Sequence, residues 1–175
     1  MSERLPGKHL ADICGERMIE RIARIADESA LFDEVLIMTR DGSIRPKNVR
    51  TVVDHSQGTL INSIIESIRQ FGAFFALAGD MPLIDSKLLK DVFNAYSDKP
   101  VAAITSTGII EPLFAIYNSG ILKGIIKYSK ESSAIHPFIE ENFSLYEVQQ
   151  MDDWKLTDVN VEEDLNMVRK ILRCP

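Results

Sequence analysis

The feature that most constrains this chain is an alternation of short apolar runs with longer amphipathic runs. Apolar runs of strand length recur along the chain, at residues 34–39, 50–54, 74–78, 101–106, 111–117, 144–149 and 157–161. Between them, apolar side chains spaced three and four residues apart predict helices at residues 15–29, 59–71, 85–96, 121–129, 136–141 and 161–172. This alternation predicts an α/β fold, a three-layer sandwich around a mostly parallel, Rossmann-like sheet.

Composition limits the classes of protein that fit. The chain has 175 residues, of which 45% are hydrophobic and 26% charged, so we expect one globular domain over residues 1–175. A formal net charge of −6 argues against nucleic-acid and membrane partners. No apolar run reaches the roughly 18 residues of a membrane span, and the first residues do not form a signal peptide. Cys14 and Cys174 have no CxxC or zinc-type spacing, so we expect both to be reduced in a cytoplasmic protein.

Two aspartates follow predicted strands, at the sheet edge where ligands bind in such folds. Asp54 ends one strand, and Asp80 lies in the turn AGDMP after another. The small residues of that turn let the backbone approach a ligand closely, and Pro82 stiffens its exit. A carboxylate at this place suits Mg²⁺, which also keeps waters and phosphate oxygens. The alternative is that Asp80 only caps a turn.

The N-terminal stretch SERLPGKHL carries two cations, Arg4 and Lys8. A planar guanidinium and a mobile ammonium group together suit a triphosphate. The alternative is a solvated, frayed terminus. The three histidines are scattered along the chain and form no nucleophile–base pattern, so we interpret His9, His55 and His136 as structural or surface residues.

Several motifs, in order along the chain, resemble the nucleotidyltransferase family that contains molybdenum cofactor guanylyltransferase. LAGDMPLI resembles that family's own signature, EPLFAIY resembles its PLFALY, and TDVNVEEDL resembles its NINTPEDL. Ser2, Arg4, Gly7 and Lys8 match the S, R, G and K of LAGGxSxRMGxDK, and Gly15 matches a hairpin glycine that precedes the first helix. The resemblance spans Ser2 to Leu172 and implies a nucleotidyltransferase sheet.

The resemblance implies a Mg²⁺-dependent guanylyltransferase, which moves GMP from GTP to the terminal phosphate of molybdopterin. Asp80 is then the metal ligand and a catalytic residue, and Arg4 and Lys8 offset the charge that develops on pyrophosphate.

The same resemblance implies the binding residues. The nucleotide-binding set is Ser2, Lys8, Thr39, Asp54 and Asp80, in which Thr39 replaces a family asparagine. The acceptor-binding pair is Asp158 and Asn160. A plain helix cap, with Glu163 as capping-box partner, is an equal alternative for Asn160.

Three further expectations follow from the resemblance. CGERMIERI also resembles the relative that acts on adenosylcobinamide phosphate, and a degenerate nucleotide-binding protein without turnover is another alternative. We expect the chain to be a monomer or a weak homo-oligomer, and its expected protein partners are molybdoenzyme-maturation proteins. Met1 stands at the variable position before Ser2, so we expect a chain that lacks the family's first strand and paired glycines and binds GTP weakly or not at all.

Overall fold

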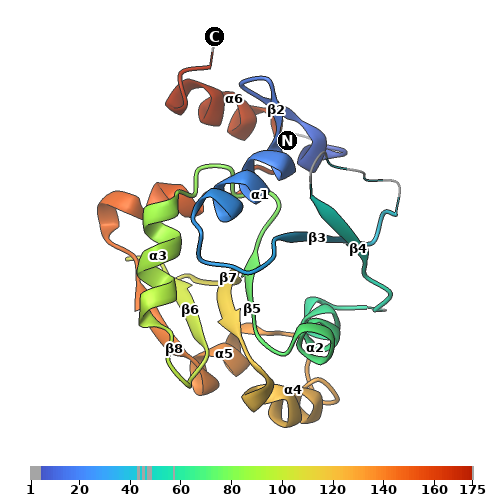
Figure 1. The fold of residues 1–175 in the computed structure, drawn as a ribbon. Helices are drawn as coiled ribbons and strands as arrows, with labels where there is room; N and C mark the ends of the chain where they lie inside the picture. The colour runs from blue at the N-terminus through green and yellow to red at the C-terminus, as the bar shows by residue number, and fades with distance from the viewer. Residues whose placement is uncertain (1–4, 43, 45, 47–48, 57, 175) are drawn as a thin grey trace. The chain divides into compact units, whose positions relative to one another are not determined.

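A computed structural model describes residues 5–42, 44, 46, 49–56 and 58–174. The chain divides into two compact units (Figure 1). The first unit contains residues 1–52, 78–90 and 151–175, and the second contains residues 53–77 and 91–150. Neither unit is one continuous stretch of sequence. The single domain over residues 1–175 stays a prediction. In the described part of the chain, no helix has both the length and the apolar character needed to cross a bilayer.

The first unit opens with a hairpin and a helix. Its elements are η1 (Lys8–Leu10), β1 (Asp12–Ile13), β2 (Glu16–Arg17), α1 (Met18–Glu28), β3 (Leu36–Thr39), β4 (Arg50–Val53), η3 (Gln150–Leu156) and α6 (Glu162–Ile171), of which β4 and η3 each have one end residue in the second unit. The predicted helix over 15–29 begins only at Met18, because the preceding residues pair in the antiparallel β1–β2 hairpin. Cys14 and Gly15 form its turn with φ of 57° and 85°, as a two-residue hairpin loop of type I′ requires.

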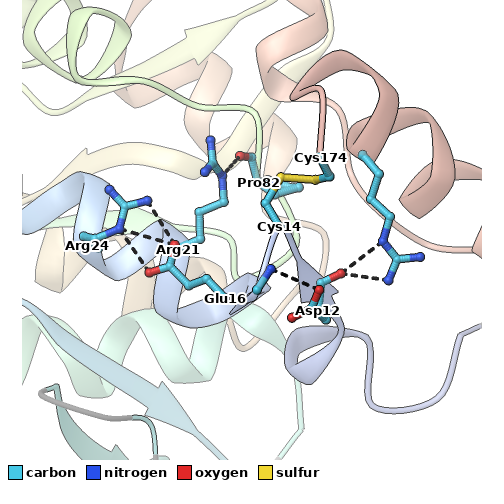
Figure 2. Close-up of a disulfide and its surroundings, with 9 residues drawn as sticks. Asp12, Cys14, Glu16, Arg21, Arg24, Pro82 and Cys174 are labelled. Carbon is cyan, nitrogen blue, oxygen red and sulfur yellow. Dashed lines mark hydrogen bonds and ion pairs between the residues drawn. A yellow bond between two sulfur atoms is a disulfide. The ribbon is translucent and has the colours of Figure 1, made fainter.

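The prediction of two reduced cysteines is wrong. Cys14, in the hairpin turn, and Cys174, just after α6, form a disulfide with 4.8 Å between their Cα atoms (Figure 2). The sequence separates them by 160 residues and so gives no sign of the pairing. The fold brings them together, because Arg169 on α6 donates two hydrogen bonds to the carbonyl oxygen of Asp12 and holds the helix beside the hairpin.

The second unit is built on a four-stranded sheet. The strand order is β5 (Phe74–Leu77), β7 (Ile110–Tyr117), β6 (Val101–Ile104) and β8 (Ser144–Glu147). One apolar cluster joins this sheet to α2 (Leu60–Phe71), α4 (Leu122–Tyr128) and α5 (His136–Asn142). In this cluster the residues alternate on β5 (Phe74 and Ala76), on β6 (Ala102 and Ile104) and at the end of β7 (Leu113, Ala115 and Tyr117), so they share one face of the sheet, which the three helices cover. α3 (Ser86–Ala95) begins in the first unit and continues into the second.

The α/β class is confirmed, but the described sheet is mixed rather than mostly parallel. β7 pairs antiparallel with both β5 and β6, and only β6 and β8 pair parallel. The reason is the connection between β6 and β7, which has room only for a tight turn over residues 105–109, with Gly108 at φ 86°. Parallel neighbours need a crossover of a dozen residues or more, so this short connection forces an antiparallel pair.

The end of the chain also differs from the expectation. Residues 157–160 form no strand, although the amide of Val159 donates to the carbonyl oxygen of Asp80. Helix α6 is capped by Asp164, whose carboxylate accepts the N–H groups of Asn160 and Val161 at 2.8 and 3.0 Å. The capping role predicted for Asn160 with Glu163 is therefore wrong, and the Asn160 side chain has another partner, described below.

Candidate functional site

Lys8 is the centre of a polar cluster in the first unit. Gly7, at φ 64°, turns the chain into η1, so that Lys8 comes at the first position of that short helix. The Lys8 ammonium group donates to Asp80 Oδ2 at 2.6 Å and to Asn160 Oδ1 at 2.8 Å. The Lys8 and Asp80 side chains are only 15% and 19% exposed, so their charges meet at a place that water reaches poorly. Three segments distant in sequence thus contribute one side chain each to the cluster.

Asp80 lies in the turn that leaves β5, and the backbone of the turn is tied to the chain near Asn160. The amide of Val159 donates to Asp80 O at 2.8 Å, and the amide of Leu5 donates to Asn160 O at 2.9 Å. These bonds place the carboxylate of Asp80 and the side-chain amide of Asn160 on either side of the same ammonium group. The cluster thus holds a positive charge between two oxygen atoms, and such an arrangement suits the binding of phosphate groups or of a metal ion.

Asp158 adds a second carboxylate to the cluster. Partial burial raises the pKa of the Asp158 carboxyl above its ordinary value, and the negative charge of Asp80 raises it further. Asp164 acts in the same direction, while the positive charge of Lys8 opposes both. A cation bound beside Asp158 and Asp80 would relieve the repulsion between their negative charges.

Four of the predicted site residues are therefore together in the first unit: Lys8, Asp80, Asp158 and Asn160. Thr39 ends β3, and its hydroxyl accepts the N–H of Asp41 at 3.1 Å. Ser2 and Arg4 lie outside the described residues.

Asp54 belongs to the second unit. Its carboxylate accepts the amide N–H of Ser56 at 2.8 Å and the hydroxyl of Ser63, on α2, at 2.7 Å. Both carboxylate oxygens are thus oriented by donors from the segment that follows β4. The role of Asp54 toward a nucleotide stays a prediction.

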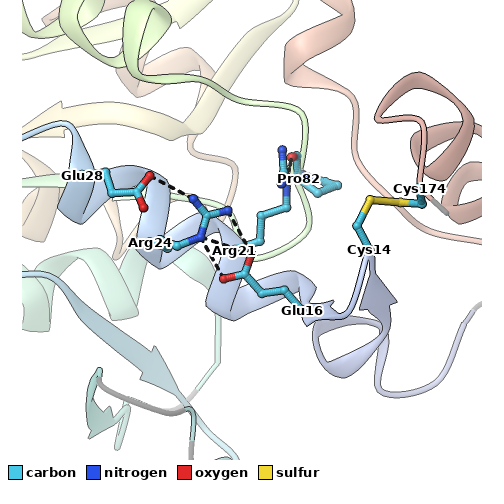
Figure 3. Close-up of polar contacts among 7 residues, drawn as sticks. All are labelled: Cys14, Glu16, Arg21, Arg24, Glu28, Pro82 and Cys174. Carbon is cyan, nitrogen blue, oxygen red and sulfur yellow. Dashed lines mark hydrogen bonds and ion pairs between the residues drawn. A yellow bond between two sulfur atoms is a disulfide. The ribbon is translucent and has the colours of Figure 1, made fainter.

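Two residues outside the predicted site contact the Asp80 turn. Arg21 lies on α1, and its Nε donates to Pro82 O at 3.0 Å (Figure 3). His9 Nδ1 lies 3.1 Å from Gly79 O. Both contacts are made to backbone carbonyl oxygens, which every position has, so the sequence carries no signal for either contact.

Comparisons with known proteins agree with this fold. The sequence model of the MobA-like NTP transferase domain matches residues 1–145. The structure of molybdopterin-guanine dinucleotide biosynthesis protein A from Archaeoglobus fulgidus superposes with a TM-score of 0.71 at 21% identity, over 95% of this chain and 90% of that one. For 2-C-methyl-D-erythritol 4-phosphate cytidylyltransferase from Thermus thermophilus the TM-score is 0.68 at 13% identity, over 95% and 93% of the two chains.

A curated relative is similar in sequence. The 3-deoxy-manno-octulosonate cytidylyltransferase of Leptospira interrogans, serovar Lai, is 31% identical over 118 residues, which are 62% of this chain and 47% of that protein. The chain spans about half the length of the curated relatives it matches.

Proposed function

The chain belongs to the MobA-like NTP transferase domain family, and on that premise we propose that it is a Mg²⁺-dependent guanylyltransferase, which moves GMP from GTP to the terminal phosphate of molybdopterin. The observation that carries the proposal is the position of the Lys8 ammonium group, bound between Asp80 Oδ2 and Asn160 Oδ1. The likeness in fold to the Archaeoglobus fulgidus protein supports the choice of acceptor.

The residues of the cluster fit Mg²⁺. In the described residues, no group of three or more His, Cys, Asp or Glu side chains is arranged to hold a metal ion. Mg²⁺ usually needs only one or two carboxylates, because it keeps several waters and binds substrate phosphates. Asp80 and Asp158 supply carboxylate oxygens, which are hard metal ligands. The Lys8 ammonium group binds Asp80 Oδ2, so this oxygen already has a cation as its partner. When bound, Mg²⁺ supplies charge neutralisation at the phosphates and a template for in-line attack.

The proposed reaction is a nucleotidyl transfer. An oxygen of the acceptor's terminal phosphate forms a bond to the α-phosphorus of GTP, and the bond from that phosphorus to the bridging oxygen breaks, so pyrophosphate leaves. Lys8 and Arg4 place positive charge near the departing pyrophosphate, where negative charge grows. Asn160, whose oxygen faces Lys8 in this structure, orients the ammonium group and, with Asp158, contributes to the acceptor side. In the first unit we assign nucleotide binding to Lys8, Thr39 and Asp80, while the roles of Ser2 and Asp54 stay predictions from the sequence.

A second candidate is transfer of CMP to a sugar acid. The observation in its favour is the 31% identity to the cytidylyltransferase of Leptospira interrogans. Both candidates share the same chemistry at the α-phosphorus and differ in the base and in the acceptor. An acceptor such as adenosylcobinamide phosphate, and nucleotide binding without turnover, are outcomes of the same experiment.

The experiment measures pyrophosphate release by the purified chain with Mg²⁺, each of GTP, CTP, ATP and UTP, and each acceptor in turn. Because the sequence predicts weak GTP binding, we expect slow release with molybdopterin at high GTP concentration, and a loss of about 100-fold or more in Asp80→Asn, which keeps the size of the side chain and removes its charge. Asp98→Asn, an exposed aspartate of the second unit, is the matched control and should leave the rate unchanged. Release with CTP alone would establish the second candidate, and nucleotide binding without release would contradict both.

A further inference from the structure

Arg21 holds the exit of the loop that carries Asp80. Its Nε donates to Pro82 O at 3.0 Å from helix α1. Pro82 has a fixed φ and no N–H, so its carbonyl oxygen is the group through which the backbone can be held there. Burial lowers the pKa of Arg21, and the positive charge of Arg24 lowers it further. Desolvating a guanidinium group is costly, and the hydrogen bond to the carbonyl offsets part of that cost.

His9 holds the entry of the same loop. Its Nδ1 lies 3.1 Å from Gly79 O, and because a carbonyl oxygen only accepts, Nδ1 carries the proton in this contact. The approach is close: a Cβ added at Gly79 would lie 3.2 Å from His9 Nδ1 and 3.7 Å from Ile19 Cδ1. A side chain at position 79 would therefore crowd the imidazole, and a glycine avoids this.

Three tethers to the loop follow from these contacts. The carbonyl oxygens of Gly79, Asp80 and Pro82 are held by η1, by the segment before α6 and by α1, respectively. Each tether comes from a different part of the first unit, so the loop has little freedom to turn the Asp80 carboxylate away from Lys8. A carboxylate that binds a metal ion has to be held to within about half an ångström, and such support comes from neighbours that do not bind the metal themselves.

We propose that Arg21 and His9 are positioning residues, which hold the carbonyl oxygens on either side of Asp80 and thereby fix the direction of its carboxylate. Both contacts are to backbone oxygen, so both residues act through the loop. The proposal rests on the proposed function, which gives the Asp80 carboxylate its role.

The test uses substitutions that remove or preserve each donor. Arg21→Met removes the guanidinium group and keeps an unbranched apolar stem, whereas Arg21→Lys keeps a charge and a donor. His9→Ala removes the donor, and His9→Asn returns an N–H close to the position of Nδ1. Arg24→Met is the matched control, since Arg24 lies on the same helix and pairs with Glu16 and Glu28 rather than with the loop (Figure 3).

Two measurements report on the loop without any turnover. The first is hydrogen exchange at the Val159 amide, which donates to Asp80 O. The second is the dissociation constant of Mn²⁺, a paramagnetic probe for the Mg²⁺ site, followed by water-proton relaxation. In Arg21→Met and in His9→Ala, we expect faster Val159 exchange and about 10- to 100-fold weaker Mn²⁺ binding. Arg21→Lys and His9→Asn should recover part of both, and Arg24→Met should change neither.

The two readouts separate this proposal from the proposed function. If the unsubstituted chain does not bind Mn²⁺ but Val159 exchange accelerates in the two donor-deletion variants, the positioning role stands and the metal assignment fails. If Mn²⁺ binds and neither its affinity nor Val159 exchange changes in these variants, the positioning role is overturned and the metal site stands. Melting temperatures within a few degrees of the parent show that each variant is folded.

Discussion

Both units of the molecule bury apolar side chains, but they differ in the covalent and polar contacts that are added to this packing. The second unit has one extended apolar cluster, in which Tyr117 stacks on Phe74 and meets Phe143 edge to face at ring distances of 5.4 and 5.2 Å. The first unit also buries many apolar side chains, among them Met18, Ile22 and Leu89, and it adds a disulfide and directional polar contacts. Apolar burial is nondirectional and gives stability, whereas polar contacts fix the direction of individual groups. The candidate site is in the first unit, where the disulfide and the polar contacts of Lys8 are added to apolar packing.

Polar contacts of the first unit recur at each segment that reaches the site. Lys155, in η3, is buried and lies 2.7 Å from both Asp85 and Asp152. Asp85 in turn accepts the Leu88 amide at the start of α3. The segment that leads to Asp158 and the segment that follows Asp80 are thus joined by one ammonium group. If the comparison holds, core substitutions should damage the second unit most, and changes in redox state or pH should damage the first.

The largest expected effect is on the apolar cluster. Ile125 on α4 is fully buried in it. Ile125→Ala should lower the free energy of unfolding by about 2–5 kcal/mol, because the lost contacts leave a cavity that the neighbours fill only in part. Urea denaturation measures the loss, and hydrogen exchange locates it, with faster exchange expected in α2, α4 and α5.

The matched control for this change is Ile109→Ala in the same unit. Ile109 is 58% exposed, so its truncation should change stability by no more than about 0.5 kcal/mol. Equal losses in the two variants would mean that burial does not dominate in this unit, and the comparison would break.

The next effect is reduction of the disulfide. Cys14 and Cys174 close a loop across 160 residues of sequence, and a cross-link of this kind stabilises mainly by restricting the unfolded chain. Addition of a thiol reductant should lower the free energy of unfolding by about 2–4 kcal/mol. Hydrogen exchange should accelerate first in the β1–β2 hairpin and in α6, which the disulfide joins.

The double variant Cys14→Ser/Cys174→Ser is the control for reduction. It should match the reduced protein in stability and should not respond further to reductant. Exchange that accelerates equally in both units would show that the cross-link does not act on the first unit in particular.

Sequence patterns predict most elements of the second unit but few connections of the first. The predicted helix over 59–71 appears as α2, Leu60–Phe71, because its apolar spacing reports directly on the face it buries. The antiparallel pairing of β7 was not predicted. The alternation of strands and helices indicates parallel strands, whereas the short β6–β7 turn requires an antiparallel pair. The disulfide was missed because pairing of distant cysteines depends on the tertiary fold.

Part of the candidate site could also be predicted from the sequence. Lys8, Asp80, Asp158 and Asn160 were chosen from motif positions, and the structure brings all four into one unit. The sequence alone does not exclude Asn160 as a helix cap, whereas in the structure Asp164 takes that role. Contacts from a side chain to a backbone carbonyl, such as that of Arg21, leave no pattern in the sequence, since a carbonyl is present at every position.

The smallest expected effect is the response of the first unit to acid. Burial alone would raise the pKa of Asp85, but the hydrogen bonds from Lys155 and from the Leu88 amide outweigh it, so the pKa lies below its ordinary value of 3.8. A carboxyl whose pKa is depressed by folding contributes stability above its unfolded pKa and loses it as the pH falls through the folded value. Stability should therefore fall below about pH 4. Because Asp85 is 44% exposed, the part due to this pair is small.

Lys155→Met separates this pair from the other carboxylates that titrate in acid. Burial alone would lower the pKa of Lys155, but its bonds to Asp152 and Asp85 outweigh burial and raise the pKa above 10.5. The stability that the ion pair contributes is therefore also lost when the pH rises through this raised pKa. Without the ammonium group, the pKa of Asp85 should move upward, and the slope of stability against pH near pH 4 should flatten. Urea denaturation between pH 3 and 6 measures both slopes, with Lys170→Met on the exposed face of α6 as control. If the slope is the same in Lys155→Met, the buried ammonium group does not hold these segments together by its charge. Apolar packing then holds them together, as it does the elements of the second unit.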